Sequence, residues 1–235
     1  FNKKFNIYMN NRRKKLFDIL VMTPREEHNK TGIGKVSDIL IDKICSSKKI
    51  NAIQTSFDTK IDFLIFRKLF LAFNYIFMSF LNRKIKLSKI IFCSTSRLPY
   101  FLPKEVFKVI FVHDLVYLTE PKTMSKLGLY ASKLLAPNSI KRANLIICPS
   151  YSTRNDIKRF YPEHSHKCRV VHLASSLYDC DEKATDNFLP KKYILCVGTI
   201  EPRKNYKRII FAYNSLPKEI KRDYALVIVG GRGWG

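Results

Sequence analysis

Short runs of apolar and β-branched residues recur along the chain as unbroken stretches that do not alternate with polar positions. They lie at Leu16–Met22, Ile90–Cys93, Val109–Val112, Leu145–Cys148, Val170–Leu173, Tyr193–Val197 and Ala225–Val229. Unbroken apolar strands are typical of a parallel sheet that is covered on both faces. The pattern therefore predicts buried parallel strands.

Two segments between these runs have the period of an amphipathic helix, residues 35–45 and residues 206–216. The apolar positions that share a face are Val36, Ile39, Leu40 and Ile44 in the first segment and Ile209, Ile210 and Tyr213 in the second. Asn205 stands before the second segment as its expected N-cap. Strand, turn and helix in alternation predict a doubly wound α/β architecture.

Glycines are concentrated after the predicted strands. Of the eight glycines, those in this position are Gly32, Gly34, Gly198, Gly230, Gly231, Gly233 and Gly235. Ligands of open α/β sheets bind at the carboxyl ends of the strands, where glycine lets the backbone approach a phosphate. The distribution favours a protein that handles nucleotides, although ordinary turns could explain each glycine singly.

The organisation predicted from the sequence is two α/β domains joined by a linker. Residues 1–15 form a basic tail, residues 16–175 the first domain, and residues 176–189 a polar, locally acidic linker without periodicity. A second domain begins at residue 190. Because the chain starts at a phenylalanine and stops directly after an apolar run, we expect a fragment of a longer protein.

The strongest local signal follows the run Tyr193–Val197. Arg203 and Lys204 stand in a turn just before a predicted helix. Two cations beside the free N–H groups of a helix N-terminus suit a diphosphate, because the side chains and the helix dipole attract it in the same direction. The alternative is a basic helix start on a basic protein.

Five segments, taken in order, resemble family 4 of the retaining, nucleotide-sugar-dependent glycosyltransferases. They are Thr31-Gly-Ile-Gly34, Val112-His-Asp-Leu115, the segment 143–152, the segment Val197-Gly-Thr-Ile-Glu-Pro-Arg-Lys-Asn205 and Leu226-Val-Ile-Val-Gly-Gly-Arg-Gly-Trp234. Their order and approximate spacing agree with that family. Its mannosyltransferase-like members in bacterial surface-polysaccharide pathways are the most similar.

The resemblance implies a GT-B architecture, in which two Rossmann-like domains face each other across a cleft. The first binds the acceptor, a saccharide or a lipid-linked sugar, and the second binds the nucleotide sugar without a metal or other cofactor. The implied donor-binding residues are Gly32, Ile33, Gly34, Arg203, Lys204 and Asn205. His113 matches a histidine beside the transferred sugar and is the implied catalytic residue.

Two departures from the family pattern affect these expectations. Many members carry an arginine directly after the glycine of the strand turn, where this chain has Thr199, so Arg203 is the only local candidate. The family's paired glutamates have no counterpart before Gly235. We therefore expect these 235 residues alone not to transfer sugar.

We also expect Gly32–Gly34, His113 and Arg203–Lys204 to converge on one cleft, since each follows a strand.

The charge of the chain bears on its partners. Lys and Arg number 43 against 19 Asp and Glu, which gives a net charge of +24. Such a protein attracts anions: phosphorylated substrates, anionic lipid head groups or nucleic acid. The basic tail and the apolar segment 69–81 favour a peripheral position at the cytoplasmic face of the membrane, with a solvated tail and a core helix as alternatives.

Two rival functions stay open from the sequence. A nucleic-acid-binding protein would explain the charge, but no zinc spacing or interleaved aromatic residues support specific binding. A GT-B relative of another kind, a sugar-nucleotide epimerase or a phosphorylase, would share the fold. The pairs Asp179/Asp181 and His164/His166 are interpreted as solvated residues, and the six cysteines as small thiols of a reducing compartment, so no metal site is predicted.

Overall fold

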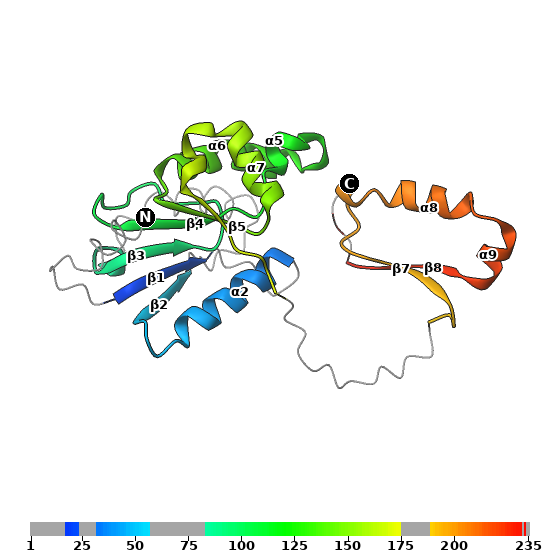
Figure 1. Ribbon diagram of the computed structural model, residues 1–235, viewed down its shortest axis with the longest axis horizontal. Helices are drawn as coiled ribbons and strands as arrows, with labels where there is room; N and C mark the ends of the chain where they lie inside the picture. The colour runs from blue at the N-terminus through cyan, green and yellow to red at the C-terminus, as the bar shows by residue number, and fades with distance from the viewer. Residues whose placement is uncertain (1–16, 24–31, 57–82, 175–188, 232, 234–235) are drawn as a thin grey trace, which may run out of the picture. The chain divides into compact units, whose positions relative to one another are not determined.

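The computed structural model describes residues 17–23, 32–56, 83–174, 189–231 and 233 (Figure 1). Several predictions lie outside the described residues: the basic tail 1–15, the apolar segment 69–81, and nearly all of the linker 176–189 with its two aspartates. The chain divides into two compact units, residues 1–115 with 133–176, and residues 116–132 with 177–235. Each is described by itself.

The first unit is built on a six-stranded parallel sheet of order β2-β1-β3-β4-β5-β6. Its strands are β1 (Phe17–Thr23), β2 (Ala52–Ser56), β3 (Ser88–Cys93), β4 (Phe107–Phe111), β5 (Leu145–Cys148) and β6 (Cys168–Val170). The predicted α/β class with a parallel sheet is confirmed. The prediction missed β2.

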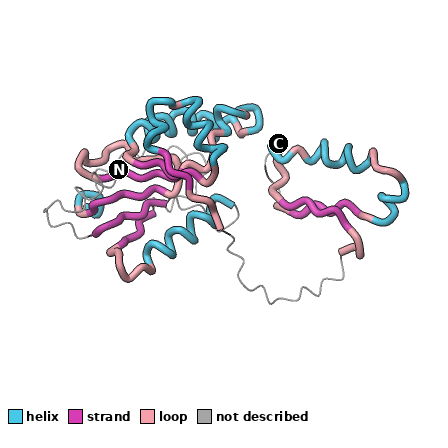
Figure 2. The backbone as a smooth tube through the Cα atoms, viewed as in Figure 1, coloured by secondary structure: helices cyan, strands magenta, loops and turns pink. Residues whose placement is uncertain are grey.

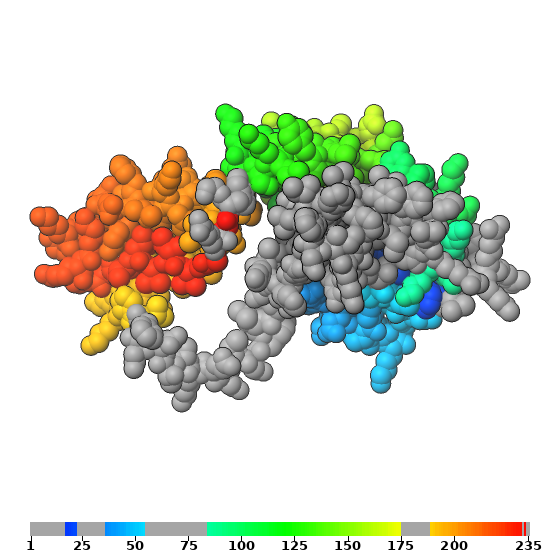
Figure 3. Space-filling view, turned by 180° about the vertical axis from the view of Figure 1, so that it is seen from behind, coloured from blue at the N-terminus to red at the C-terminus, as the bar shows by residue number. Residues whose placement is uncertain are grey.

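Helices cover both faces of this sheet (Figures 1 and 2). The helices of this unit are α2 (Gly32–Cys45), α4 (Arg83–Lys86), the part of α6 (Lys126–Arg142) after residue 132, and α7 (Tyr151–Phe160), with the 3₁₀ turn η2 (Pro162–Lys167). The helix α5 (Val116–Thr119), the 3₁₀ turn η1 (Pro121–Thr123) and the start of α6 are assigned to the second unit. In the views of Figures 1 and 2, α2 lies on one side of the sheet and α6 and α7 on the other. Figure 3 shows α5 and α6, in green, at the surface.

The core beneath α2 shows why the strands are unbroken apolar runs. Ile41 packs with alternate residues of four central strands, among them Val21, Ile90 and Val109. The residues between them, such as Ile91, are also fully buried and face the opposite layer. Burial on both faces explains why these strands are almost entirely apolar, and Lys108 of β4, 8% exposed, is an exception among the described central strands.

The expected face of α2 is partly wrong. Ile39 is 39% exposed, whereas Ile41 is 6% exposed and belongs to the core. The packed side of the helix is Ser37, Leu40, Ile41 and Ile44, at the spacing of three and four residues that places side chains on one helical face. Gly32 and Gly34 also differ from expectation, because they form the first turn of α2 and not a loop.

The second unit contains a two-stranded parallel sheet. Its elements are β7 (Tyr193–Val197), the 3₁₀ turn η3 (Pro202–Lys204), α8 (Tyr206–Asn214), α9 (Lys218–Asp223) and β8 (Ala225–Val229). This is one βαβ crossover, and both strands have the predicted bounds. No helix in the described part of the chain has the length and apolar character needed to cross a membrane.

Candidate functional site

The carboxyl edge of the six-stranded sheet has a topological switch point between β1 and β3. The chain runs from β1 outward to β2 and then returns to β3 on the other side of β1. In open α/β sheets ligands bind outside the carboxyl ends of the strands at such a point. The helix α2, which begins at Gly32, follows β1 and so starts at this edge. Gly32, Ile33 and Gly34 form the first turn of this helix, and their contact with a donor stays a prediction.

His113 follows β4 at the same edge and is held on several sides. Its Nε2 lies 3.0 Å from the carbonyl oxygen of Ser94, and its own carbonyl accepts a 3.1 Å hydrogen bond from Thr153 Oγ1. Its ring contacts that of Phe111, with centroids 4.5 Å apart. Because a carbonyl oxygen only accepts, Nε2 carries a proton in this contact.

Two serines at this edge were missed by the sequence analysis. Ser94 follows β3 and is fully buried, and its Oγ finds no hydrogen-bond partner among the described residues. Ser150 follows β5 and caps α7, because its Oγ accepts a 3.2 Å bond from the Thr153 N–H. Each stands one or two residues after an apolar run, and that position is the signal by which the sequence could have shown them.

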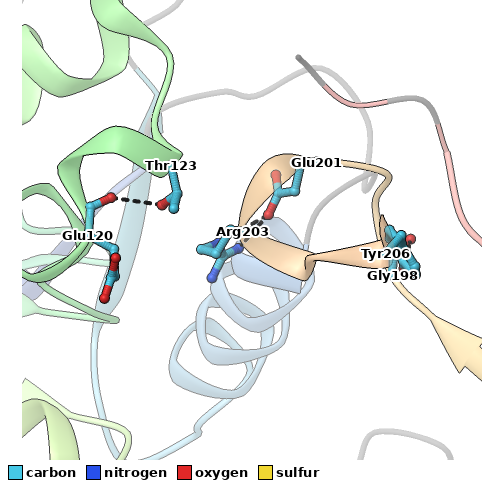
Figure 4. A network of polar contacts seen from close by, with 6 residues as sticks. All are labelled: Glu120, Thr123, Gly198, Glu201, Arg203 and Tyr206. Atoms are coloured by element: carbon cyan, nitrogen blue, oxygen red, sulfur yellow. Dashed lines mark hydrogen bonds and ion pairs between the residues drawn. The ribbon is translucent and has the colours of Figure 1, made fainter. Parts of the chain in front are cut away.

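In the second unit, the loops that follow β7 and β8 are joined by backbone hydrogen bonds. The Gly198 N–H donates to the Val229 carbonyl at 2.9 Å, and the Ile200 N–H donates to the Gly231 carbonyl at 3.0 Å. Gly198 has φ of +154°, a conformation that side chains disfavour. Its carbonyl accepts a 2.7 Å bond from the Tyr206 hydroxyl, which ties the loop to α8 (Figure 4).

Arg203 and Lys204 lie in this loop, but their charges are not equally available. The Arg203 guanidinium donates to one oxygen of Glu201, with N···O distances of 2.9 and 3.1 Å (Figure 4). The side chain of Glu201 is 13% exposed and that of Arg203 46%. Glu201 therefore offsets the charge of Arg203, a pairing that sequence reasoning did not consider.

The side chain of Lys204 lies along the backbone of Gly198. A Cβ placed on that glycine would be 3.3 Å from Lys204 Cε, so the lysine stem crosses the end of β7. Among the described residues, no carboxylate or carbonyl pairs with the Lys204 ammonium. Lys204 is thus the cation of this loop that has charge to offer a ligand.

Asn205 precedes α8 as predicted but does not cap it with its side chain. Its backbone is left-handed, with φ of 52° and ψ of 42°, and the side chain makes no capping hydrogen bond. Asparagine tolerates this conformation better than most residues. The residue ends η3 by donating its N–H to the Pro202 carbonyl at 3.1 Å, and its own carbonyl accepts from the Arg208 N–H. Asn205 is thus the N-cap residue that the sequence predicts, but without a capping bond from its side chain.

The described residues contain no group of three or more His, Cys, Asp or Glu side chains arranged to hold a metal ion. His164 and His166 both lie in η2. Burial, together with the nearby Lys167, lowers the pKa of His164. The predicted residues thus fall into two groups: Gly32–Gly34 with His113 on one sheet edge, and Arg203–Asn205 at the end of β7. That the two groups meet in one cleft stays a prediction.

A parallel sheet with a switch point, and a separate strand–glycine–lysine–helix unit, define a Rossmann-like α/β protein with a candidate anion site. Residues 180–234 match the family described as "Glycosyl transferases group 1". This match covers the unit that holds Lys204. This segment of the chain is therefore similar to that family of glycosyltransferases.

Three curated proteins are similar to parts of this chain. The O-antigen chain mannosyltransferase B of Escherichia coli is 28% identical over 145 residues, which cover 57% of this chain and 38% of the relative. The serotype-specific mannosyltransferase WbdA of Escherichia coli is 30% identical over 111 residues, 40% of this chain and 14% of the relative.

The third relative is the N-acetylgalactosamine-N,N'-diacetylbacillosaminyl-diphospho-undecaprenol 4-alpha-N-acetylgalactosaminyltransferase of Campylobacter jejuni, 31% identical over 100 residues, 42% of this chain and 26% of the relative. The chain spans well under half the length of these relatives. All three are named as glycosyltransferases, and none is named as an epimerase, a phosphorylase or a nucleic-acid-binding protein.

Proposed function

We propose that this chain is part of a retaining glycosyltransferase that moves a sugar from a nucleotide sugar to a lipid-linked or saccharide acceptor in bacterial surface-polysaccharide synthesis. The six-stranded unit would hold the acceptor and the unit with β7 and β8 the donor diphosphate. Mannose is the proposed sugar, because two relatives are named as mannosyltransferases. No metal is required in this proposal.

The observation that carries the proposal is the Lys204 ammonium at the end of β7. It has no ion-pair partner among the described residues and stands just before the first turn of α8. Departure of a nucleoside diphosphate places negative charge on a phosphate oxygen, and a preorganised cation beside N–H dipoles stabilises that charge. The matched family segment, residues 180–234, contains this loop.

His113 would act on the acceptor side of the same reaction. Its Nε2–H is engaged by the Ser94 carbonyl, which fixes the orientation of the ring. The role proposed for His113 beside the transferred sugar rests on its place after β4 at the carboxyl edge of the sheet. A peripheral position at the cytoplasmic membrane face is part of the proposal, since a lipid-linked acceptor is reached there.

The experiment that tests the donor site is calorimetric titration of the chain with GDP and GDP-mannose. Lys204→Ala should lower affinity by about tenfold to a hundredfold, the worth of a hydrogen bond to a charged group, about 1.5–3 kcal/mol. Arg203→Ala should cost less, because part of its interaction is already made with Glu201. Lys218→Ala is the matched control, since it removes an exposed lysine from α9, which precedes β8 and so lies at the opposite end of the strands.

Equal losses for Lys204→Ala and Lys218→Ala would mean that net charge, and not this loop, binds the nucleotide. The activity itself is tested on the full gene product by release of nucleoside diphosphate from GDP-, UDP- and dTDP-sugars. The release has to depend on a polyprenyl-linked acceptor extract. Turnover that ignores the acceptor would exclude a transferase.

A further inference from the structure

Two side chains of the loop after β7 share the space over Gly198. A Cβ placed on this glycine would lie 3.2 Å from the Tyr206 hydroxyl oxygen and 3.3 Å from Lys204 Cε. Lys204 ends η3, and Tyr206 is the first residue of α8. The hydroxyl and the lysine stem therefore fill the volume that a side chain at position 198 would take, so they lie close to each other.

The Tyr206 hydroxyl is bonded to the backbone of the same glycine. It donates to the Gly198 carbonyl oxygen at 2.7 Å, as the dashed contact at the start of α8 shows (Figure 4). The oxygen also lies against Gly230 of the facing loop. No second donor among the described residues bonds to it. The hydroxyl is thus what satisfies this carbonyl at the end of β7.

This carbonyl is also the backbone acceptor nearest to the path of the lysine. The Lys204 ammonium stands one bond beyond Cε, so rotation about the last side-chain bonds turns it toward the peptide of Gly198. An ammonium has three hydrogens to donate and takes any acceptor within reach. With the hydroxyl in place, the ammonium has no carbonyl or carboxylate partner among the described residues. The hydroxyl occupies the acceptor that competes with a ligand for the ammonium.

We propose that Tyr206 is a positioning residue for Lys204, because its hydroxyl occupies the Gly198 carbonyl and so leaves the ammonium available to an anionic phosphate. The inference deepens the proposed function and rests on it, since the anion is the donor diphosphate. Tyr206 acts through Lys204 and makes no contact with the ligand itself. Removal of the hydroxyl turns the lysine onto the backbone and weakens the site without removing its charge.

The same helix supplies a matched control. The Tyr213 hydroxyl donates to the Tyr224 carbonyl at 2.8 Å, which is the same kind of bond at nearly the same length. Tyr224 directly precedes β8, so this bond lies at the opposite end of the strands from Gly198. Tyr206→Phe and Tyr213→Phe therefore remove one tyrosine-to-carbonyl bond each from α8, and the first alone lies beside Lys204.

The first measurement is calorimetric titration of the 235-residue chain with GDP. Tyr206→Phe should weaken binding about fivefold, the worth of one net hydrogen bond, while Tyr213→Phe should bind GDP like the parent chain. Urea unfolding of both variants measures the loss of stability that they share. Equal weakening of GDP binding in the two variants would make Tyr206 a structural residue only and overturn the proposal.

The second measurement separates positioning from direct contact. In a Lys204→Ala background, Tyr206→Phe should cause no further loss of GDP affinity, because the residue that it positions is absent. A direct bond from the Tyr206 hydroxyl to the nucleotide predicts the opposite, a further loss of about fivefold in that background. That outcome would also overturn the proposal.

The third measurement needs no nucleotide. Trace acetylation with acetic anhydride, followed by mass spectrometry, gives the reactivity of Lys204 relative to the exposed Lys218 of α9. Tyr206→Phe should lower this ratio about fivefold, since an amine held on the carbonyl is less available, and Tyr213→Phe should leave it unchanged.

An unchanged ratio in Tyr206→Phe would overturn the positioning role whatever the GDP titration shows. If the parent chain fails to bind GDP, the proposed donor site is wrong, and the acetylation ratio still tests the effect of Tyr206 on Lys204. The two failures are therefore distinguishable.

Discussion

Gly230 lies where the loops after β7 and β8 meet, and alanine at this position should force them apart. A Cβ on Gly230 would overlap the carbonyl oxygen of Gly198 and lie 2.6 Å from its carbonyl carbon. The obstacle is backbone, so no change of rotamer relieves it. The loops have to move, which strains the bonds from Gly198 to Val229 and from Ile200 to Gly231.

The size of the effect follows from two contributions. Overpacking at a rigid contact costs about 1–3 kcal/mol, and loss of one backbone hydrogen bond about 1 kcal/mol more. We expect the local opening free energy to fall by about 3 kcal/mol, which accelerates amide exchange roughly a hundredfold. The readout is hydrogen–deuterium exchange of the amides of Gly198 and Ile200, which donate across the two loops.

Gly231→Ala provides the matched control at the next residue. A Cβ on Gly231 meets no atom within 4 Å, so its exchange rates should equal those of the parent chain. Faster exchange in both variants would show that any alanine in this loop disturbs it. Unchanged exchange in Gly230→Ala would refute the close approach of the two loops.

Three further predictions concern the first unit. The hydrogen bond from Lys89 lowers the pKa of Asp18, so this carboxylate stabilises the fold above its ordinary pKa and the contribution is lost as the pH falls through the lower folded pKa. Urea unfolding of Asp18→Asn should show a loss of about 1 kcal/mol at neutral pH that vanishes in acid. Burial raises the pKa of Cys93 to about 12, so iodoacetamide should leave it unmodified in the native chain while alkylating the exposed Cys45, as mass spectrometry can show. Ser139→Ala should cost about 1–3 kcal/mol in denaturant unfolding, because it leaves a buried backbone N–H without an acceptor.

The bounds of a strand were predicted correctly where a proline or a glycine directly follows it. Leu145–Cys148 is followed by Pro149, and Tyr193–Val197 and Ala225–Val229 are each followed by a glycine, and all three have the predicted bounds. The run Val170–Leu173 was placed too late. The observed β6 is Cys168–Val170, because β5, its partner among the described strands, ends at Cys148 and the last bond comes from the N–H of Val171.

The edge strand β2 and the helix α6, whose exposed face includes apolar residues, were not predicted from the sequence. Within the described part of the sheet, β2 is an edge strand that pairs with β1, and its sequence Ala-Ile-Gln-Thr-Ser is not an unbroken apolar run. The helix α6 contains Gly128 and Pro137, and the exposed side chains of Leu127, Tyr130 and Leu134 add apolar residues to its sequence. The period of an amphipathic helix is therefore blurred in the sequence. Both features follow from tertiary context that the local pattern does not contain.

In the candidate site, the sequence predicted which side chains occur but not which of their charges are available. Arg203 and Lys204 are adjacent cations, and a count of charges treats them alike. The structure separates them, because the carboxylate of Glu201 reaches the guanidinium while the lysine runs over Gly198. Glu201 stands only two residues before Arg203, so its effect depends on the turn of the chain at Pro202.

This pairing leads to a final prediction about donor binding under the proposed function. An ion pair whose arginine is half exposed is worth about 0.2–1 kcal/mol, whereas a hydrogen bond to a charged phosphate is worth about 1.5–3 kcal/mol. A bound diphosphate can therefore draw Arg203 from Glu201, at the cost of that pair. Glu201→Gln removes the competing charge, so calorimetry should show GDP affinity rising by up to about fivefold, and the added Arg203→Ala should abolish the gain. If Glu201→Gln instead weakens GDP binding, the carboxylate holds the arginine in its binding position, and the two residues act together on the diphosphate.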